Sequence, residues 1–388
     1  MNIQNVALQY ADYVILAVFI AFSSAFFISK GYSNTDIGLI LSIVNIGSLF
    51  LSPVVANYAD TSQKYNVIQI LLMLTLFSMI FIVPLYVIDH KSIILSVSFI
   101  IVMIVVYASL PLFNTVGFKM EEYGVKSNYG FARAFGSMSY AISSALIGNI
   151  VNKYGGNAVS VCGFTASLLM VLLLVWTNHT FKNNEKIVEL QKEDKEPIKL
   201  LDFIKHHKDL FILCIAYALI LFTPNIIENF LIQVITPVGG TNKDVGYLTF
   251  MWAMLEIPTM LAFNLIKRKF KIEKLLIFAA IIYLLKVILL YLANSMTLVY
   301  IALSFQWCSF ALYCPAMVEY INGKVNKDEE VRGQALSSTV NSVFMIFEST
   351  IIGVLLDNIG PKPLFLLGII ATALGLVILV FVFKKLDK

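Results

Sequence analysis

Charge is scarce in this chain of 388 residues. Charged residues make up 13% of the sequence, hydrophobic residues make up 59%, and the mean hydropathy is +0.83. A soluble domain cannot bury that much apolar surface, because part of any globule faces water. The composition therefore argues against a soluble protein and predicts one that lies in a lipid bilayer.

Several chemistries are missing as well. The four cysteines lie in apolar runs at spacings typical of neither a metal site nor a disulfide framework. All four histidines lie outside those runs, so no predicted span carries an imidazole proton relay. No HExxH, GxSxG or phosphate-binding loop occurs. We therefore expect no enzyme, no cofactor, no metal site and no pumping driven by ATP.

What the sequence does contain is a series of apolar runs of about 20 residues, the length that crosses a ~30 Å hydrocarbon core as a helix. Such runs must be helices, because lipid offers the backbone no hydrogen-bond partner. The alternating pattern of a membrane β-barrel is absent. A count of ten spans would result if the short loops were misread, because the spans 297–321 and 332–356 contain polar interruptions. The twelve predicted spans are 6–28, 36–57, 66–88, 92–114, 128–151, 158–177, 209–236, 244–266, 274–293, 297–321, 332–356 and 362–384.

The longest polar stretch, residues 178–208, has six spans on either side. This predicts two six-helix bundles, residues 1–177 and 209–388, joined by a linker, as in the parallel-repeat plan of major facilitator transporters. With both termini cytoplasmic, 21 of the 28 Lys and Arg residues fall in inside loops or the tail and five fall outside. That asymmetry follows the positive-inside rule and supports an even number of spans in a cell membrane.

Ionisable side chains inside spans are the candidate functional groups, since each costs at least ~2.5–3.5 kcal/mol to insert at mid-bilayer. Glu256 and Lys286 lie at matching depth on consecutive spans, so we interpret them as an ion-coupling pair, the alternative being a pair that only fixes helix register. Glu348 and Glu228 are further ion-coupling candidates. We interpret Asp12 and Glu319 as solvated helix ends.

Two side chains suit a bound solute. Arg133 has a guanidinium fork that fits a carboxylate or hydroxyl groups, although an Arg near a helix end can instead extend its head group to water. Trp252 lies one helical turn before Glu256 and would either stack on a sugar or aromatic ring or simply pack.

At this point the chain resembles a known family. The run from Tyr129 to Ser137, YGFARAFGS, is similar to the fifth helix of the lactose permease and phenylpropionate permease branch of the major facilitator superfamily. That pattern places Gly three residues before an Arg, Gly three after it and an aromatic seven after it, which here are Gly130, Arg133, Gly136 and Tyr140. The resemblance implies that Arg133 contacts substrate and that Tyr140 stacks on it.

Other positions match less closely. Asp60 falls at the acidic position of the signature loop between helices 2 and 3, which implies a conformational role, although that loop is degenerate here. Lys286 stands where these relatives usually have an Arg. Gln306 stands where the family has a His, and Ser309 where lactose permease has its proton-binding Glu. Galactoside specificity is therefore doubtful, and Gln306 is expected to line the binding site.

These observations predict a proton-coupled symporter of a small polar solute, with an oligosaccharide, a nucleoside or an aromatic acid as candidates. The alternatives are a drug/proton antiporter, a channel and, further from the pattern, a membrane sensor or enzyme. The expected partners are the solute, protons or another coupling cation, and the bilayer. Nucleic acid is not expected, and we expect a monomer.

Overall fold

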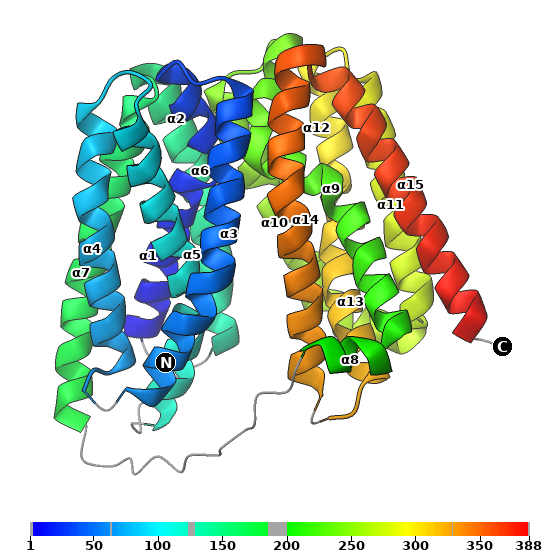
Figure 1. Ribbon diagram of the computed structural model, residues 1–388, viewed down its shortest axis with the longest axis horizontal. Coiled ribbons are helices and arrows are strands. Elements are labelled where there is room, and N and C mark those ends of the chain that lie inside the picture. The colour runs from blue at the N-terminus through cyan, green and yellow to red at the C-terminus, as the bar shows by residue number, and fades with distance from the viewer. Residues whose placement is uncertain (1–2, 63, 123–128, 185–199, 328, 387–388) are drawn as a thin grey trace. The chain divides into compact units, whose positions relative to one another are not determined.

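The computed structural model describes residues 3–62, 64–122, 129–184, 200–327 and 329–386. Within these ranges every regular element is a helix (Figure 1). Eleven helical stretches are long and apolar enough to cross a membrane, and a pair bent by 40°, α1 (Ile3–Phe19) with α2 (Ser23–Ser29), makes a twelfth if it is counted as one span. The predicted all-helical membrane fold of up to twelve spans is confirmed.

The chain divides into two compact units. Unit 1 comprises Met1–Glu193 and Thr241–Phe250, and unit 2 comprises Asp194–Gly240 and Met251–Lys388. In unit 1, α1 packs against three other helices, α5, α6 and α7, so it lies inside the bundle. Besides α1 and α2, the helices of unit 1 are α3 (Asn34–Thr61), α4 (Val67–Val87), α5 (Ile93–Glu122), α6 (Tyr129–Tyr154) and α7 (Asn157–Asn184).

Unit 2 holds a broken span. Helices α12 (Met296–Ser304) and α13 (Phe310–Lys324) are separated by the 3₁₀ turn η3 (Phe305–Trp307), and together they form one candidate crossing. The remaining elements are α8 (Leu200–His206), α9 (Lys208–Ile235), η2 (Thr236–Val238), α11 (Ile272–Leu292), α14 (Glu330–Ile359) and α15 (Pro361–Leu386). Helix α10 (Asn242–Lys269) belongs to this unit from Met251 onward.

In unit 2 the start of the first long helix contacts the end of the last. Lys385 at the end of α15 donates a 3.0 Å hydrogen bond to Asp209 at the start of α9. The first and the last crossing of this bundle therefore begin and finish at the same end. An even number of crossings in unit 2 follows from this contact.

Polar signals mark the helix ends. Ser33 and Asp36 form a reciprocal capping box at the start of α3, and Asn66 and Gln69 form another at the start of α4. Each box satisfies backbone groups that the first turn of a helix leaves without partners.

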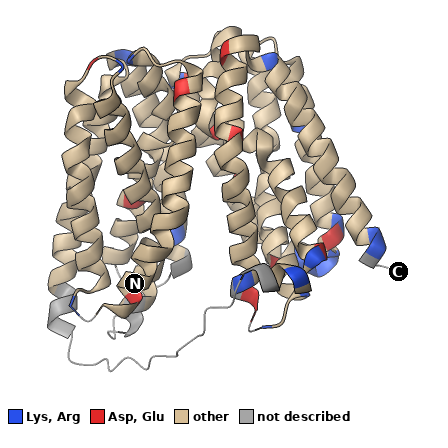
Figure 2. Ribbon diagram, viewed as in Figure 1, with Lys and Arg blue, Asp and Glu red and all other residues tan. Residues whose placement is uncertain are grey.

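In Figure 2 the Lys and Arg residues of unit 2 gather mainly at one end of its helices, whereas the helix middles are almost uncharged.

Large apolar side chains lie on the outside of the helices. Phe50 is 71% exposed, Leu261 is 76% exposed and Phe381 is 69% exposed. Such exposure would be costly in water, but lipid tails are as apolar as these side chains. The bundles are therefore built to be surrounded by hydrocarbon.

A polar contact ties three segments of unit 1 together at one end of the bundle. Lys30, which follows α2, donates a 2.7 Å hydrogen bond to Asp89 in the loop before α5. Asn157 at the start of α7 donates to the same carboxylate oxygen at 2.8 Å. The Lys30 side chain is buried, whereas Asp89 is exposed. The hydrogen bonds from Lys30 and Asn157 lower the pKa of Asp89.

Replacing this carboxylate tests the tie. We expect Asp89→Asn to lower the Tm of the purified protein at neutral pH, because the buried ammonium of Lys30 loses its charged partner. A carboxyl whose pKa is lowered by folding stabilises the protein at neutral pH, and this stabilisation is lost as the pH falls through the folded-state pKa. The difference in Tm between wild type and variant should therefore shrink in acid.

The matched control is Asp209→Asn, because the Asp209–Lys385 pair has both side chains largely exposed. Exposed pairs contribute little, so its Tm should stay close to that of the wild type. Equal Tm values for Asp89→Asn and wild type at neutral pH would show that the tie does not stabilise unit 1.

Candidate functional site

Three polar side chains of unit 2, two of them buried and one half-buried, form one hydrogen-bonded network. Lys286 on α11 donates its Nζ to Oε1 of Gln306, and Nε2 of Gln306 donates a 2.7 Å hydrogen bond to Oε1 of Glu256 on α10. Lys286 is 3% exposed and Gln306 is 8% exposed. We call this set the Glu256–Gln306–Lys286 network.

The carboxamide of Gln306 suits its place between opposite charges. It offers an acceptor oxygen to the ammonium and a donor nitrogen to the carboxylate, so each charged neighbour receives the bond type that it needs. Burying an ammonium or a carboxylate without such partners would be strongly unfavourable. The structure thus brings the two predicted coupling residues together through Gln306, which the sequence indicated only as a polar lining residue.

The broken span explains why Gln306 can reach both partners. Gln306 lies in η3, and Ser309 just after it has φ −100° and ψ −91°, outside helical geometry. In a regular helix the Gln306 side chain would lie on the face that the helical repeat sets. The 3₁₀ turn η3 changes the direction of this side chain. Breaks in membrane helices are tolerated where the backbone is surrounded by protein or lines a cavity, and in transporters they mark binding sites.

A second polar contact in unit 2 joins α9 to α14. Asn225 donates a 2.7 Å hydrogen bond to Oε2 of Glu348, while the buried Oε1 of Glu348 has no hydrogen-bond partner among the residues that the structure describes. Helix α9 is irregular here, with Pro224 inside it and a non-helical conformation at Phe230. Glu228 lies on the same stretch, and no hydrogen bond places it with Glu348 in the described part of the chain.

Two other candidates of unit 2 stay outside these networks. Trp252 is half-buried on α10 and makes no hydrogen bond or ring contact among the residues that the structure describes. Glu319 pairs with Lys267 at 2.9 Å and its side chain is 45% exposed, so its interpretation as a solvated helix end is confirmed.

In unit 1, Arg133 and Tyr140 of α6 gather around an aromatic ring of α1. The guanidinium carbon of Arg133 lies 4.4 Å from the ring centroid of Tyr13, and Nη1 donates a 2.9 Å hydrogen bond to Ser137. The Tyr13 ring meets the Tyr140 ring edge-on, with centroids 6.5 Å apart. Tyr13 was missed by the sequence analysis, although it stands among polar residues in the first span.

Gly136 is what lets Tyr13 approach α6. A Cβ atom at this position would lie 2.7 Å from Cδ2 of the Tyr13 ring, which is closer than real contacts allow. A hydrogen bond of 2.7 Å from Ser139 to the carbonyl of Tyr10 holds the same two helices together. Gly136 and Ser139 thus place the Tyr13 ring under Arg133.

One expectation is wrong. Asp12 is not a solvated helix end, because it is only 3% exposed. Helix α1 lies inside unit 1 with α5, α6 and α7 around it, so even a residue three turns from its start is covered. The positive charge of Arg133 interacts electrostatically with Asp12.

Asp60, Glu121 and Glu122 are three further acidic residues of unit 1. Asp60 lies exposed in the last turn of α3, and its predicted conformational role stays a prediction. Glu121 and Glu122 are the carboxylates that precede Arg133 in the sequence, and their side chains lie outside the described residues. Within the described part of the chain, no group of three His, Cys, Asp or Glu side chains could hold a metal ion.

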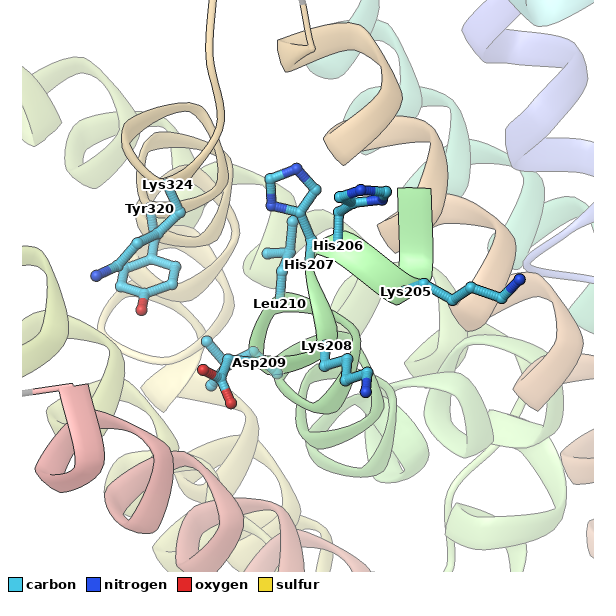
Figure 3. A pocket seen from close by; sticks show the side chains of 9 residues that line it. Lys205, His206, His207, Lys208, Asp209, Leu210, Tyr320 and Lys324 are labelled. Atoms are coloured by element: carbon cyan, nitrogen blue, oxygen red, sulfur yellow. The ribbon is translucent and has the colours of Figure 1, made fainter. Parts of the chain in front are cut away.

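A polar pocket of about 370 Å³ occupies one end of unit 2, around the junction of α8 and α9 (Figure 3). Its basic side chains are Lys205, Lys208 and Lys324, with His206 and His207 between them. The figure shows the three amino groups pointing in different directions, away from a common centre. The pocket therefore presents no convergent set of donors for an anion.

Comparison with known proteins decides the family. The model of the MFS_1 like family matches residues 8–383. The chain belongs to this family. Among curated proteins, an uncharacterized transporter of Bacillus subtilis (strain 168), YwbF, is 20% identical over 268 residues, which cover 68% of this chain and 64% of that protein. The chain thus spans slightly less than two thirds of this relative.

Solved transporter structures share the fold of this MFS_1-like protein. The nucleoside transporter NupG matches with a TM-score of 0.77 at 13% identity over the whole of both chains. A bacterial homologue of the iron transporter ferroportin has a TM-score of 0.73 at 14% identity, covering 98% of this chain and 99% of that one. A D-xylose–proton symporter has a TM-score of 0.68 at 13% identity, covering 98% and 95%.

The protein is therefore a multi-pass membrane protein of the MFS_1 like family, with the fold of these solved transporters. Identities this low establish the fold alone, and the family match does not select a branch. The resemblance to lactose permease and phenylpropionate permease stays a prediction.

The role of Gln306 as a bridge can be tested by removing its polar atoms. We expect Gln306→Leu to lower the free energy of unfolding by about 1–3 kcal/mol, because Lys286 and Glu256 each lose a hydrogen bond in a buried setting. Thermal unfolding of purified protein measures the change. Ser304→Ala, which removes an ordinary hydroxyl of the same span that bonds the carbonyl of Ile301, is the control and should change the Tm little.

Proposed function

We propose that this protein is a proton-coupled symporter that carries a small polar solute by alternating access. The observation that supports this most is the Glu256–Gln306–Lys286 network. Ionisable groups inside a membrane bundle are costly, and they commonly mark a substrate or ion route. A network that contains both charges and lies at a helix break has the features expected of such a route.

For the solute we propose recognition by the Arg133, Tyr13 and Tyr140 cluster of unit 1. A guanidinium donates paired hydrogen bonds to carboxylates or to neighbouring hydroxyl groups. Aromatic rings beside it offer a flat apolar face on which a sugar or a base can stack. An oligosaccharide, a nucleoside or an aromatic acid fits this combination, and two of the structural neighbours are named as nucleoside and xylose transporters.

For coupling we propose that Glu256 binds and releases the proton. Ionised Glu256 accepts a charge-assisted hydrogen bond from Gln306, which is stronger than the bond that a neutral carboxyl accepts. Protonation therefore weakens the link between α10 and η3 and leaves the charge of Lys286 without its counter-charge. Through this change the proton would alter the preferred conformation of unit 2. Glu348, held by Asn225, is the second candidate for the proton, and Glu228 the third.

Solute binding should depend on Arg133. We expect Arg133→Ala to abolish binding of the solute, because no other donor fork replaces the guanidinium, while the protein still inserts and folds. A thermal-shift screen of wild type against sugars, nucleosides and aromatic acids identifies a ligand, and the variant is then titrated with it.

Lys153→Ala is the matched control for this change. Lys153 also lies over an aromatic ring, that of Tyr154, but at the far end of α6. Binding should be unchanged in this variant. Undiminished binding by Arg133→Ala would remove Arg133 from the site.

Coupling should depend on Glu256. We expect Glu256→Gln to keep solute exchange across proteoliposome membranes but to lose uphill accumulation driven by a pH gradient, because the glutamine cannot release a proton. Glu319→Gln, at the solvated helix end, should behave as wild type. Normal accumulation by Glu256→Gln would refute the assignment, and wild-type uptake that ignores the pH gradient would refute proton coupling itself.

A further inference from the structure

Unit 1 contains a small cavity, lined by both polar and apolar side chains, that the proposed function does not use. Its volume is about 20 Å³. A cavity needs roughly 10–15 Å³ to hold one water molecule, so this space holds a single water molecule or a single small ion. Its walls come from α1, α4, α5 and α7, and its polar lining residues are Asp12, Thr75, Ser78, Ser109 and Ser167. We call it the Asp12 cavity.

Asp12 brings a carboxylate to this cavity. The residue is 3% exposed, and within the described part of the chain its carboxylate forms no hydrogen bond or ion pair. Arg133 is the charged group whose field reaches it. An ionised carboxylate inside a membrane bundle is strongly destabilising unless something compensates its charge. The cavity beside it is where such a compensating group fits.

Four side chains that line the cavity carry hydroxyl groups. Thr75, Ser78 and Ser109 each donate their hydroxyl proton at 2.8 Å to a carbonyl three or four residues earlier on their own helix. Because those protons are committed, the oxygens can act towards the cavity only as acceptors. Ser167 adds a fourth hydroxyl and is 2% exposed. The lining thus combines a carboxylate with three hydroxyl oxygens whose protons are already bonded to backbone carbonyls.

We propose that the Asp12 cavity is a sodium-binding site. Carboxylate and hydroxyl oxygens are hard ligands, which prefer hard cations to the softer transition metals. A single carboxylate balances one positive charge, so a monovalent ion fits better than calcium, which is typically bound by several acidic ligands. A water molecule suits this lining less well, because it would find acceptors for its protons but few donors for its oxygen.

Asp12 in this cavity also interacts electrostatically with Arg133, which belongs to the proposed solute site. A cation that neutralises Asp12 removes a negative charge that acts on Arg133, and this makes the guanidinium a stronger attractor for an anionic or hydroxyl-rich solute. Sodium binding itself stands without the proposed function. Only this link to the solute rests on it.

The test is thermal unfolding of the purified full chain in detergent. Sodium chloride is titrated against choline chloride at constant ionic strength and pH, with potassium chloride as a second series. A ligand that binds only the folded state raises the Tm in a saturable way. We expect such a rise with sodium, little with potassium and none with choline.

Variants locate the ion. Asp12→Asn should lose the sodium-dependent rise, and Ser109→Ala should move its midpoint to higher sodium concentration while the protein still folds. Glu319→Gln removes an exposed carboxylate of unit 2 and should keep the wild-type response. If Asp12→Asn does not fold, the comparison of Ser109→Ala and Ser78→Ala with wild type decides the question.

Three results would overturn the proposal. Wild type that responds equally to sodium and choline binds no sodium. A full sodium response in Asp12→Asn, or an unchanged midpoint in both serine variants, places the ion elsewhere. Stabilisation by acid that is lost in Asp12→Asn, with no sodium response in wild type, assigns the cavity to a proton. None of these measurements involves solute transport, so they leave proton coupling through Glu256 untouched.

Discussion

A hydrocarbon environment supplies no hydrogen-bond partner, so each polar group inside these bundles must be satisfied by another part of the chain. This constraint explains why the charged side chains within the spans occur in groups. Gln306 stands between Lys286 and Glu256, and Asn225 binds Glu348. Asp12, whose carboxylate has no hydrogen-bond partner among the described residues, lines a cavity of about 20 Å³.

The two units meet this constraint in different ways. Unit 1 uses close helix packing, in which Gly136 admits the Tyr13 ring beside Arg133. Unit 2 uses broken helices, since η3 redirects Gln306, and Asn225 lies between Pro224 and the irregular residue Phe230. A rigid packed contact suits recognition of a solute, whereas an interrupted helix adjusts more easily when a proton binds or leaves. This difference is consistent with assigning recognition to unit 1 and coupling to unit 2.

Much of the architecture was predictable from the sequence. Apolar runs of bilayer length can only be helices, and their number and order followed from the polar breaks between them. Matching depth on consecutive spans was enough to connect Glu256 with Lys286. The resemblance to a known fifth helix pointed to Arg133 and Tyr140, which the structure brings into one cluster with Tyr13.

What the sequence could not supply is the direction in which each helix faces. A span that is apolar all round shows no periodic pattern that separates its lipid side from its protein side. Depth alone therefore placed Asp12 at a solvated end, whereas packing of α1 inside unit 1 buries it. The bridge through Gln306 likewise depends on a local break whose geometry is set by neighbouring helices. The sequence by itself determined which residues lie in the membrane, and only the tertiary structure decided which of them meet, because side-chain contacts depend on how the helices are rotated against one another.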